Sequence, residues 1–121
     1  MNCKTKGRDK YLGIDSAKND CARRDFTVEQ AEKCIAEGWM DPEDTQNSSP
    51  TAGEIVKFCK ANPAFIMHGY VVSPHRDDTR VSLEGVRAVK KPTAKQVKAF
   101  VEMFRCADDF TLAPDYYAWY D

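Results

Sequence analysis

Apolar and polar side chains alternate along residues 65–72 and again along 80–88, with a polar turn between the two runs. A period of two is what a strand with one buried face requires. The intervening residues include Ser73, Pro74 and two aspartates, which favour a turn. The pattern therefore predicts a long antiparallel β-hairpin, and this hairpin determines the fold class more strongly than any other feature of the chain.

The pairing register of the hairpin is restricted by the sizes of the facing side chains. One register sets large side chains against partners of matching or small size: Val71 opposite Val81, Gly69 opposite Leu83 and Met67 opposite Gly85. A slip of one residue would mix the apolar and polar faces of the strands. We therefore expect this register, which also sets Glu84 opposite His68 on the polar face.

Three segments with helical periodicity begin with the same signal, a threonine followed three residues later by Glu or Gln. The pairs are Thr27 with Gln30, Thr51 with Glu54, and Thr93 with Gln96. In such a capping box the threonine oxygen accepts a hydrogen bond from a backbone N–H of the first turn, and the Glu or Gln accepts from the N–H of the capping residue. The apolar stripes that follow predict helices over about 28–37, 52–61 and 94–106.

These elements predict an α+β fold: a small antiparallel sheet built on the 65–88 hairpin, with about three helices packed on one face. Two strands alone are marginal in water, so we expect a third strand from either the aromatic segment 115–121 or residues 11–15. Residues 1–25 are polar without a sustained period, and we interpret them as an N-terminal arm. Residues 26–121 then form a single α+β domain.

The composition is that of an ordinary globular chain: 121 residues, of which 42% are hydrophobic and 31% charged. No apolar run approaches the ~20 residues of a membrane span, and the N-terminal sequence contains no apolar signal region. We therefore expect a cytoplasmic protein without membrane contacts. The net charge of −1 argues against nucleic acid as a partner, because such proteins usually present a strongly basic face.

The five cysteines lie 13 or more positions apart, so they lack the paired spacing of zinc ligands. Cys34, Cys59 and Cys106 lie in or near helical patterns beside apolar residues, and we expect them to be buried free thiols. A metal site built from His68, His75 and a turn aspartate would need groups separated by most of a strand. The sequence therefore predicts no metal site and no cofactor.

The polar face of the hairpin gathers groups capable of acid–base chemistry. His68 and Glu84 face each other across the strands, and Tyr70 lies on the same face. A neighbouring carboxylate orients an imidazole ring and raises its basicity, as a general base requires. The hypothesis is a catalytic set of His68, Glu84 and Tyr70; the alternative is a solvated sheet face with an ordinary cross-strand pair.

The turn and the residue that follows it contain further polar candidates. His75, Arg76 and Arg80 lie close together with two aspartates, and loops on rigid hairpins often carry function. We take these three as candidate ligand-binding residues, with either Arg80 or Tyr70 placed to orient an anion. The alternative is a polar turn without function, because Asp and Pro favour turns on their own.

The outer face of the third helix carries a stripe of basic residues: Lys91, Lys95, Lys98 and Arg105. This stripe could hold phosphates, or dock the acidic segment 107–121 of the same or a neighbouring chain. It could equally be the solvated side of an amphipathic helix.

The C-terminal segment contains four aromatic residues with aspartates around them: Tyr116, Tyr117, Trp119 and Tyr120. In a strand they would alternate, with Tyr117 and Trp119 on one side and the other two opposite. Aromatic residues at an edge strand are typical of interaction surfaces. Such a strand could also simply complete the core of its own sheet.

Two functions from different classes remain open. The leading hypothesis is an interaction or self-association module, which binds a second copy or a protein partner through the C-terminal aromatic edge. The alternative is a small-ligand binder or enzyme that uses His68 and Glu84 as an acid–base pair. The burial of His68 separates the two, because catalysis needs this residue in a concave, partly covered site.

Overall fold

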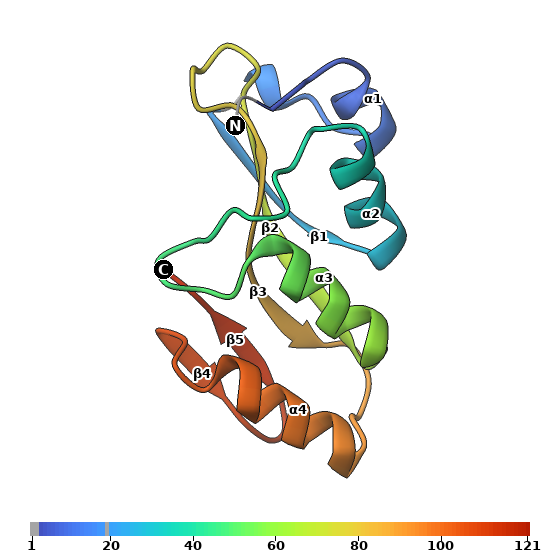
Figure 1. Ribbon diagram of the computed structural model, residues 1–121, viewed down its shortest axis with the longest axis vertical. Helices are drawn as coiled ribbons and strands as arrows, with labels where there is room; N and C mark the ends of the chain where they lie inside the picture. Colours follow the sequence, from blue (N-terminus) through green and yellow to red (C-terminus); the bar gives the residue numbers. More distant parts are fainter. Residues whose placement is uncertain (1–2, 19) are drawn as a thin grey trace.

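The structure, a computed structural model, describes residues 3–18 and 20–121. The strands are β1 (Cys21–Phe26), β2 (Phe65–Val72), β3 (Val81–Ala88), β4 (Asp109–Thr111) and β5 (Tyr117–Trp119). The α-helices are α1 (Arg8–Leu12), α2 (Val28–Ala36), α3 (Ala52–Ala61) and α4 (Ala94–Phe104), with a 3-10 turn at Ser16–Lys18. The strands form one five-stranded antiparallel sheet in the order β1-β2-β3-β5-β4 (Figure 1), which confirms the α+β class.

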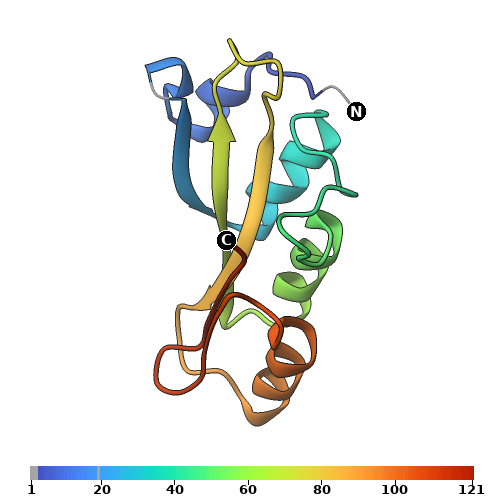
Figure 2. The same ribbon diagram turned by 90° about the vertical axis from the view of Figure 1, so that its left-hand side faces the viewer.

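The three predicted helices are α2, α3 and α4, and each ends within two residues of its expected end. All three begin with a complete capping box, with Thr27, Thr51 and Thr93 as the capping residues. Figure 2 shows the three helices on the same side of the sheet. None of the helices in the described residues combines the length and the apolar character that a bilayer crossing demands.

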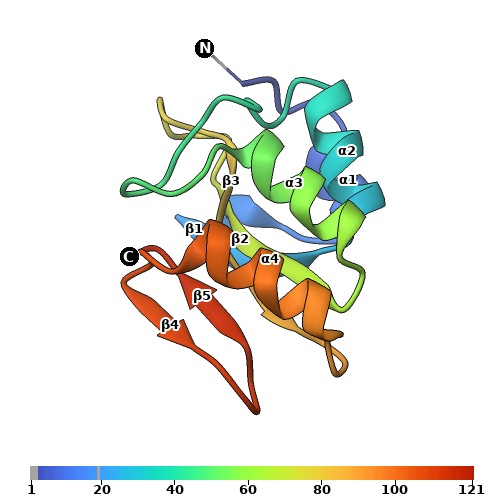
Figure 3. The ribbon, with the colours of Figure 1, turned by 60° about the horizontal axis from the view of Figure 1, so that its bottom comes forward.

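The core lies between this layer of helices and the sheet. Its centre is a run of aromatic contacts in which Phe65 of β2 packs against Phe58 of α3 and Phe100 of α4. Phe100 also stacks on Phe110 of β4, so the β4–β5 hairpin closes the core alongside α4 (Figure 3). These contacts leave the opposite face of the sheet without an α-helix of the described chain.

The central hairpin keeps the predicted register over only part of its length. Val71 pairs with Val81 and Gly69 with Leu83, as expected, but the register then shifts. The prediction for Met67 was wrong, because it pairs with Val86. The shift is a β-bulge, in which Glu84 is one extra residue on β3.

Two positions next to the bulge, 69 and 85, need glycine. A Cβ on Gly69 would lie 1.9 Å from the carbonyl oxygen of Ser82, and one on Gly85 would lie 2.0 Å from the carbonyl oxygen of Ala118. Both positions therefore need glycine because neighbouring backbone approaches closely. His68 pairs with Gly85 rather than with Glu84, which corrects the predicted pairing and leaves Glu84 beside the imidazole instead of directly opposite it.

The sheet gains strands on both sides of the hairpin. The C-terminal segment supplies β5, as one of the two alternatives predicted, whereas Tyr11 and Leu12 lie in α1. The expectation of an aromatic edge was wrong, because β5 pairs with β3 on one side and β4 on the other. The other added strand is β1, and all of its residues except Phe26 lie within the expected arm 1–25. The expected boundary after residue 25 therefore falls inside a strand.

The N-terminal residues are joined to the hairpin by Arg8, whose side chain is 0% exposed. Its guanidinium donates hydrogen bonds to Asp9, Ser16, Thr79 and the carbonyl of Val72, at distances of 2.9 to 3.1 Å. A buried arginine is tolerated only when its donors are satisfied. The described part of this segment is therefore fixed against the body by a polar contact rather than by apolar packing alone.

Candidate functional site on the open face of the sheet

The face of the sheet opposite the helices gathers charged and aromatic side chains from four strands. Strand alternation brings the following residues to it: Arg23 and Asp25 of β1, His68 of β2, Glu84 of β3, and Tyr117 and Trp119 of β5. We call these six residues the aromatic face. They line a shallow hollow of about 360 Å³, which lies within the size range of small ligand sites.

Glu84 is the buried charge of the aromatic face. Its side chain is 7% exposed, and its Oε2 accepts a hydrogen bond of 2.7 Å from Nη1 of Arg23. Burial raises the pKa of the Glu84 carboxyl, and the charge of Arg23 acts in the opposite direction. The indole N–H of Trp119 also holds this pKa down, although its geometry falls short of a hydrogen bond.

The guanidinium of Arg23 lies over the indole of Trp119, with Cζ 5.4 Å from the ring centroid. This is a cation–π arrangement. The side chain is nevertheless 62% exposed. Arg23 therefore forms a solvent-facing cover over Glu84 and Trp119.

His68 lies beside this pair and is 14% exposed. Its ring stacks on Tyr117, with centroids 5.8 Å apart and planes inclined by 12°. Burial lowers the pKa of His68, while Asp25 acts to raise it. The imidazole is thus predominantly neutral at pH 7, and Nε2 makes no hydrogen bond within the described residues.

The predicted catalytic set is only partly brought together. Nδ1 of His68 is 3.8 Å from Oε2 of Glu84, which is adjacent but too long for a hydrogen bond. Tyr70 belongs to another group, because its hydroxyl donates to Gln46 and accepts from Arg80. A neutral imidazole beside a carboxylate could accept a proton, but Tyr70, the third residue of the predicted catalytic set, does not lie with them.

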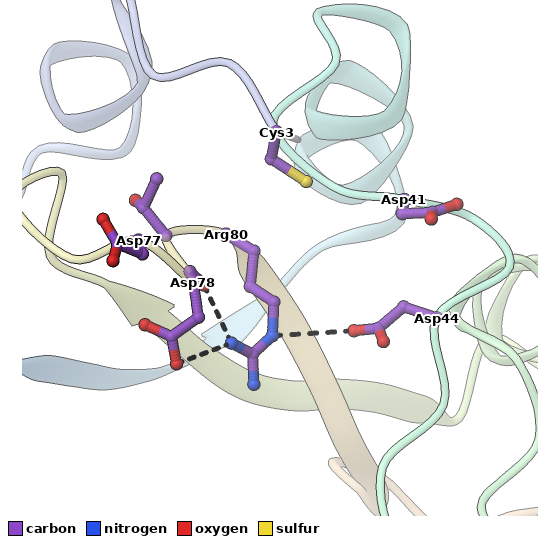
Figure 4. A pocket seen from close by; sticks show the side chains of 7 residues that line it. Cys3, Asp41, Asp44, Asp77, Asp78 and Arg80 are labelled. Atoms are coloured by element: carbon purple, nitrogen blue, oxygen red, sulfur yellow. Dashed lines mark hydrogen bonds and ion pairs between the residues drawn. The ribbon is translucent and has the colours of Figure 1, made fainter. Parts of the chain in front are cut away.

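Arg80 lies at the other end of the hairpin, in a pocket of about 370 Å³ lined largely by aspartates (Figure 4). Its guanidinium donates to the backbone carbonyl of Asp78 at 2.8 Å and lies 3.8 Å from the carboxylate of Asp44. It also stands 5.5 Å from the ring centroid of Tyr70. Its predicted role of orienting an anion near His68 has no geometric support, because Arg80 already holds these groups together.

The two other turn candidates also lie away from the aromatic face. Arg76 makes two hydrogen bonds to the carboxylate of Asp78, at 2.9 and 2.8 Å. His75 is exposed, and its backbone N–H donates to Ser73. The turn is therefore organised by its own contacts. We call the polar network that surrounds it the hairpin-end cluster: Arg8, Asp44, Tyr70, Asp78, Thr79 and Arg80.

The C-terminal aromatic residues divide between the two faces as alternation predicts. Tyr120 is 3% exposed and packs near Phe104, and Tyr116 lies edge-on to Phe100. Tyr120 therefore belongs to the core, and the half-buried Tyr116 packs against it. Tyr117 and Trp119 are half-buried on the opposite side, in the aromatic face.

Arg23 and Asp25, the two residues that β1 contributes, were not predicted as site residues. The signal was present in the alternation of Cys21 to Phe26, but Arg24 occupies a core-facing position and hides the period. Its guanidinium lies over the ring of Phe26, so its stem packs while its charge reaches a backbone carbonyl. A half-buried arginine at a core-facing position therefore gives the strand the sequence pattern of a polar arm.

The cysteines are free thiols. Cys34 and Cys59 are buried as predicted, and burial raises their pKa values to about 11 and about 12. The prediction for Cys106 was wrong, because it is exposed just beyond the end of α4. In the described residues no group of three or more Cys, His, Asp or Glu side chains is arranged to hold a metal ion.

Comparison with known proteins found no match to a family model, a curated protein or a solved structure. The chemistry of the aromatic face is therefore the basis for any statement about function.

Proposed function

We propose that this chain is a protein-interaction module whose binding surface is the aromatic face. One observation carries the proposal: Tyr117, Trp119 and Arg23 lie together, partly exposed, on the side of the sheet opposite the helices. Tyrosine, tryptophan and arginine are the residues that most often dominate binding energy at interfaces. The partner is a protein or a second copy of the chain.

Binding would use the face of the sheet rather than its edge. Residues Tyr117–Trp119 already pair with strands on both sides, so they offer no free backbone groups for an added strand. Their side chains are held in a fixed array by contacts with His68. A preorganised aromatic array loses little conformational freedom when it binds, which favours affinity.

The test uses the double variant Tyr117→Ala/Trp119→Ala. Peptides selected without bias from a displayed library should bind the original chain and lose most of their affinity for this variant. Light scattering of the concentrated protein covers the case of a second copy, because any dimer should revert to monomer. Circular dichroism must show that the variant remains folded.

Tyr11→Ala is the matched control, since Tyr11 is an exposed aromatic residue on α1, outside the aromatic face. It should leave peptide binding and molecular mass unchanged. The proposal fails if the double variant binds the selected peptides, and keeps its mass, as the original chain does.

A second function is favoured by one specific observation. Two buried nitrogens of the hollow, Nε2 of His68 and Nε1 of Trp119, make no hydrogen bond within the described residues, and buried polar atoms are normally satisfied. A small ligand with polar atoms would supply partners, with His68 and Glu84 as an acid–base pair. Thermal unfolding in the presence of a panel of nucleotides, sugar phosphates and carboxylates tests this function. A ligand at 100 times its dissociation constant stabilises the folded state by ~2.7 kcal/mol. If no compound of the panel raises the unfolding temperature, the second function is excluded.

A further inference from the structure

Arg23 occupies a site that has the chemistry of a receptor for a cation. One wall is the indole face of Trp119, and the base is the carboxylate of Glu84. A tryptophan face attracts a cation more strongly than other aromatic rings do. A carboxylate that is 7% exposed also needs a positive partner, because an unpaired buried charge is costly.

The surroundings of this site are acidic. Asp121 raises the pKa of Glu84, and Asp109 raises that of Tyr117, so both charges act on the hollow. Asp109 also pairs in register with Trp119. Several carboxylates therefore act on the indole site that Arg23 occupies, and Arg87, another cation of this face, is already bound to Asp25.

Arg23 itself is held in a way that permits its replacement. It is 62% exposed and makes one hydrogen bond to Glu84. Arg80 at the hairpin-end cluster, by contrast, makes hydrogen bonds to both Asp78 and Tyr70. Because the guanidinium of Arg23 faces solvent, water can replace Glu84 as its partner more easily than it could for a buried arginine.

We propose that Trp119 and Glu84 form a recognition site for an arginine side chain of a basic peptide, and that Arg23 fills this site in the unbound protein. The incoming guanidinium takes the place of Arg23 over the indole and on the carboxylate, while Arg23 turns outward to solvent. This inference rests on the proposed function and names the class of partner that the aromatic face accepts.

The test measures binding of the blocked tripeptide acetyl-Gly-Arg-Gly-amide to the full chain. The readout is the indole N–H signal of Trp119 in NMR spectra, distinguished from that of Trp39 by its loss in Trp119→Phe. The tripeptide with citrulline in place of arginine is neutral and nearly isosteric. We expect the arginine tripeptide to shift the signal and the citrulline tripeptide to bind about tenfold more weakly, because charge-assisted hydrogen bonds are about twice as strong as neutral ones.

Two variants with the same change in charge separate replacement from general electrostatics. Arg23→Ala empties the site and should tighten binding of the arginine tripeptide by about threefold to tenfold. Arg87→Ala removes a cation from the same face without touching Trp119, and should tighten it by less than about twofold. Glu84→Gln should weaken binding by about tenfold.

Equal binding of the two tripeptides, or equal effects of Arg23→Ala and Arg87→Ala, would overturn the inference. Its failure is distinguishable from that of the proposed function. If library peptides need Tyr117 and Trp119 but bind equally well after their arginines are replaced by citrulline, the aromatic face remains an interaction surface and only the arginine site is excluded.

Discussion

The two polar regions of this protein use the same kinds of residue to different ends. Arg80 in the hairpin-end cluster and Arg23 in the aromatic face each lie over an aromatic ring, at 5.5 and 5.4 Å, and each pairs with a carboxylate. Arg80 is 28% exposed, whereas Arg23 is 62% exposed. The donors and acceptors of the hairpin-end cluster bond to one another. In the aromatic face, Nε2 of His68 and Nε1 of Trp119 are buried without a well-formed hydrogen bond to any described residue.

The two regions show how a polar network that stabilises the fold can be distinguished from one that binds a partner. A saturated network gains nothing from an added molecule, since every donor would have to give up a partner. An unsaturated network beside partly exposed aromatic rings gains contacts when a partner arrives. We therefore propose that the hairpin-end cluster serves stability and the aromatic face binding, and the following changes test this division.

The largest effect is expected from Arg8→Met. This change removes a guanidinium with 0% exposure and leaves Asp9 and Thr79 without its hydrogen bonds. Removing one member of a buried charged network typically costs about 3 kcal/mol or more. Urea unfolding should show a fall of this size in the free energy of unfolding.

The comparison variant is Arg23→Ala in the aromatic face. Removal of the Arg23 side chain, which covers Glu84 from the solvent side, lets water reach this carboxylate, so the loss should be about 1 kcal/mol or less. A loss at Arg23 as large as the loss at Arg8 would contradict the division into a structural and a binding region.

The second effect concerns the bulge that brings Glu84 beside His68. In Gly85→Ala the new Cβ would lie 2.0 Å from the carbonyl oxygen of Ala118 and 2.9 Å from Nε2 of His68. Forcing atoms into such a contact should cost about 2 kcal/mol and should displace the His68 ring.

Gly53→Ala is the control for the loss of a glycine. Gly53 lies in α3, and a Cβ added there would lie 3.2 Å from the carbonyl oxygen of Pro42, its nearest neighbour. Alanine also favours a helix. The stability of this variant should change by less than about 1 kcal/mol. Equal urea midpoints for the two variants would show that the bulge tolerates a side chain at residue 85.

The bulge also marks where prediction from the sequence ended. Local signals were sufficient for α2, α3 and α4, because a capping box such as Thr93 with Gln96 lies within one turn, whereas α1 has no such signal and was not predicted. Alternation was sufficient for the hairpin as far as Gly69 opposite Leu83. Beyond that point the sequence allows Gly85 to pair with Met67, or with His68 after a bulge at Glu84. The close approach of Gly85 to Ala118 of β5 accompanies the second register, and the sequence of the hairpin alone does not reveal it.

The candidate site was predictable only within single segments of the chain: the central hairpin, and the C-terminal strand with Tyr117 and Trp119 on one side. His68 and Glu84 were expected to be neighbours and are, at 3.8 Å. The partner of Glu84 is Arg23, which is 61 positions away in the sequence. That contact depends on β1 pairing with β2, and no local pattern encodes such a long-range choice.

The smallest effect is a pH dependence confined to the aromatic face. His68 is surrounded by Asp25 and Arg23 of β1, Glu84 and Arg87 of β3, and Tyr117 of β5. Because burial lowers its pKa below the ordinary 6.5, the unfolded chain takes up a proton in a range where the folded chain does not. The free energy of unfolding therefore falls as the pH drops through 6.5 toward the folded pKa, and His68 has no such effect above 6.5.

Titration of the His68 ring signals by NMR, assigned through their loss in His68→Gln, measures this directly. The midpoint should lie below 6.5, and Asp25→Asn should lower it further, because the Asp25 charge favours the protonated ring. Urea midpoints at pH 7.5 and 5.5 should show a smaller acid-induced loss of stability in His68→Gln than in the original chain. A midpoint above 6.5 would mean that Glu84 and Asp25 outweigh burial, and that the hollow holds a charged rather than a neutral imidazole at the site where an arginine is expected to bind.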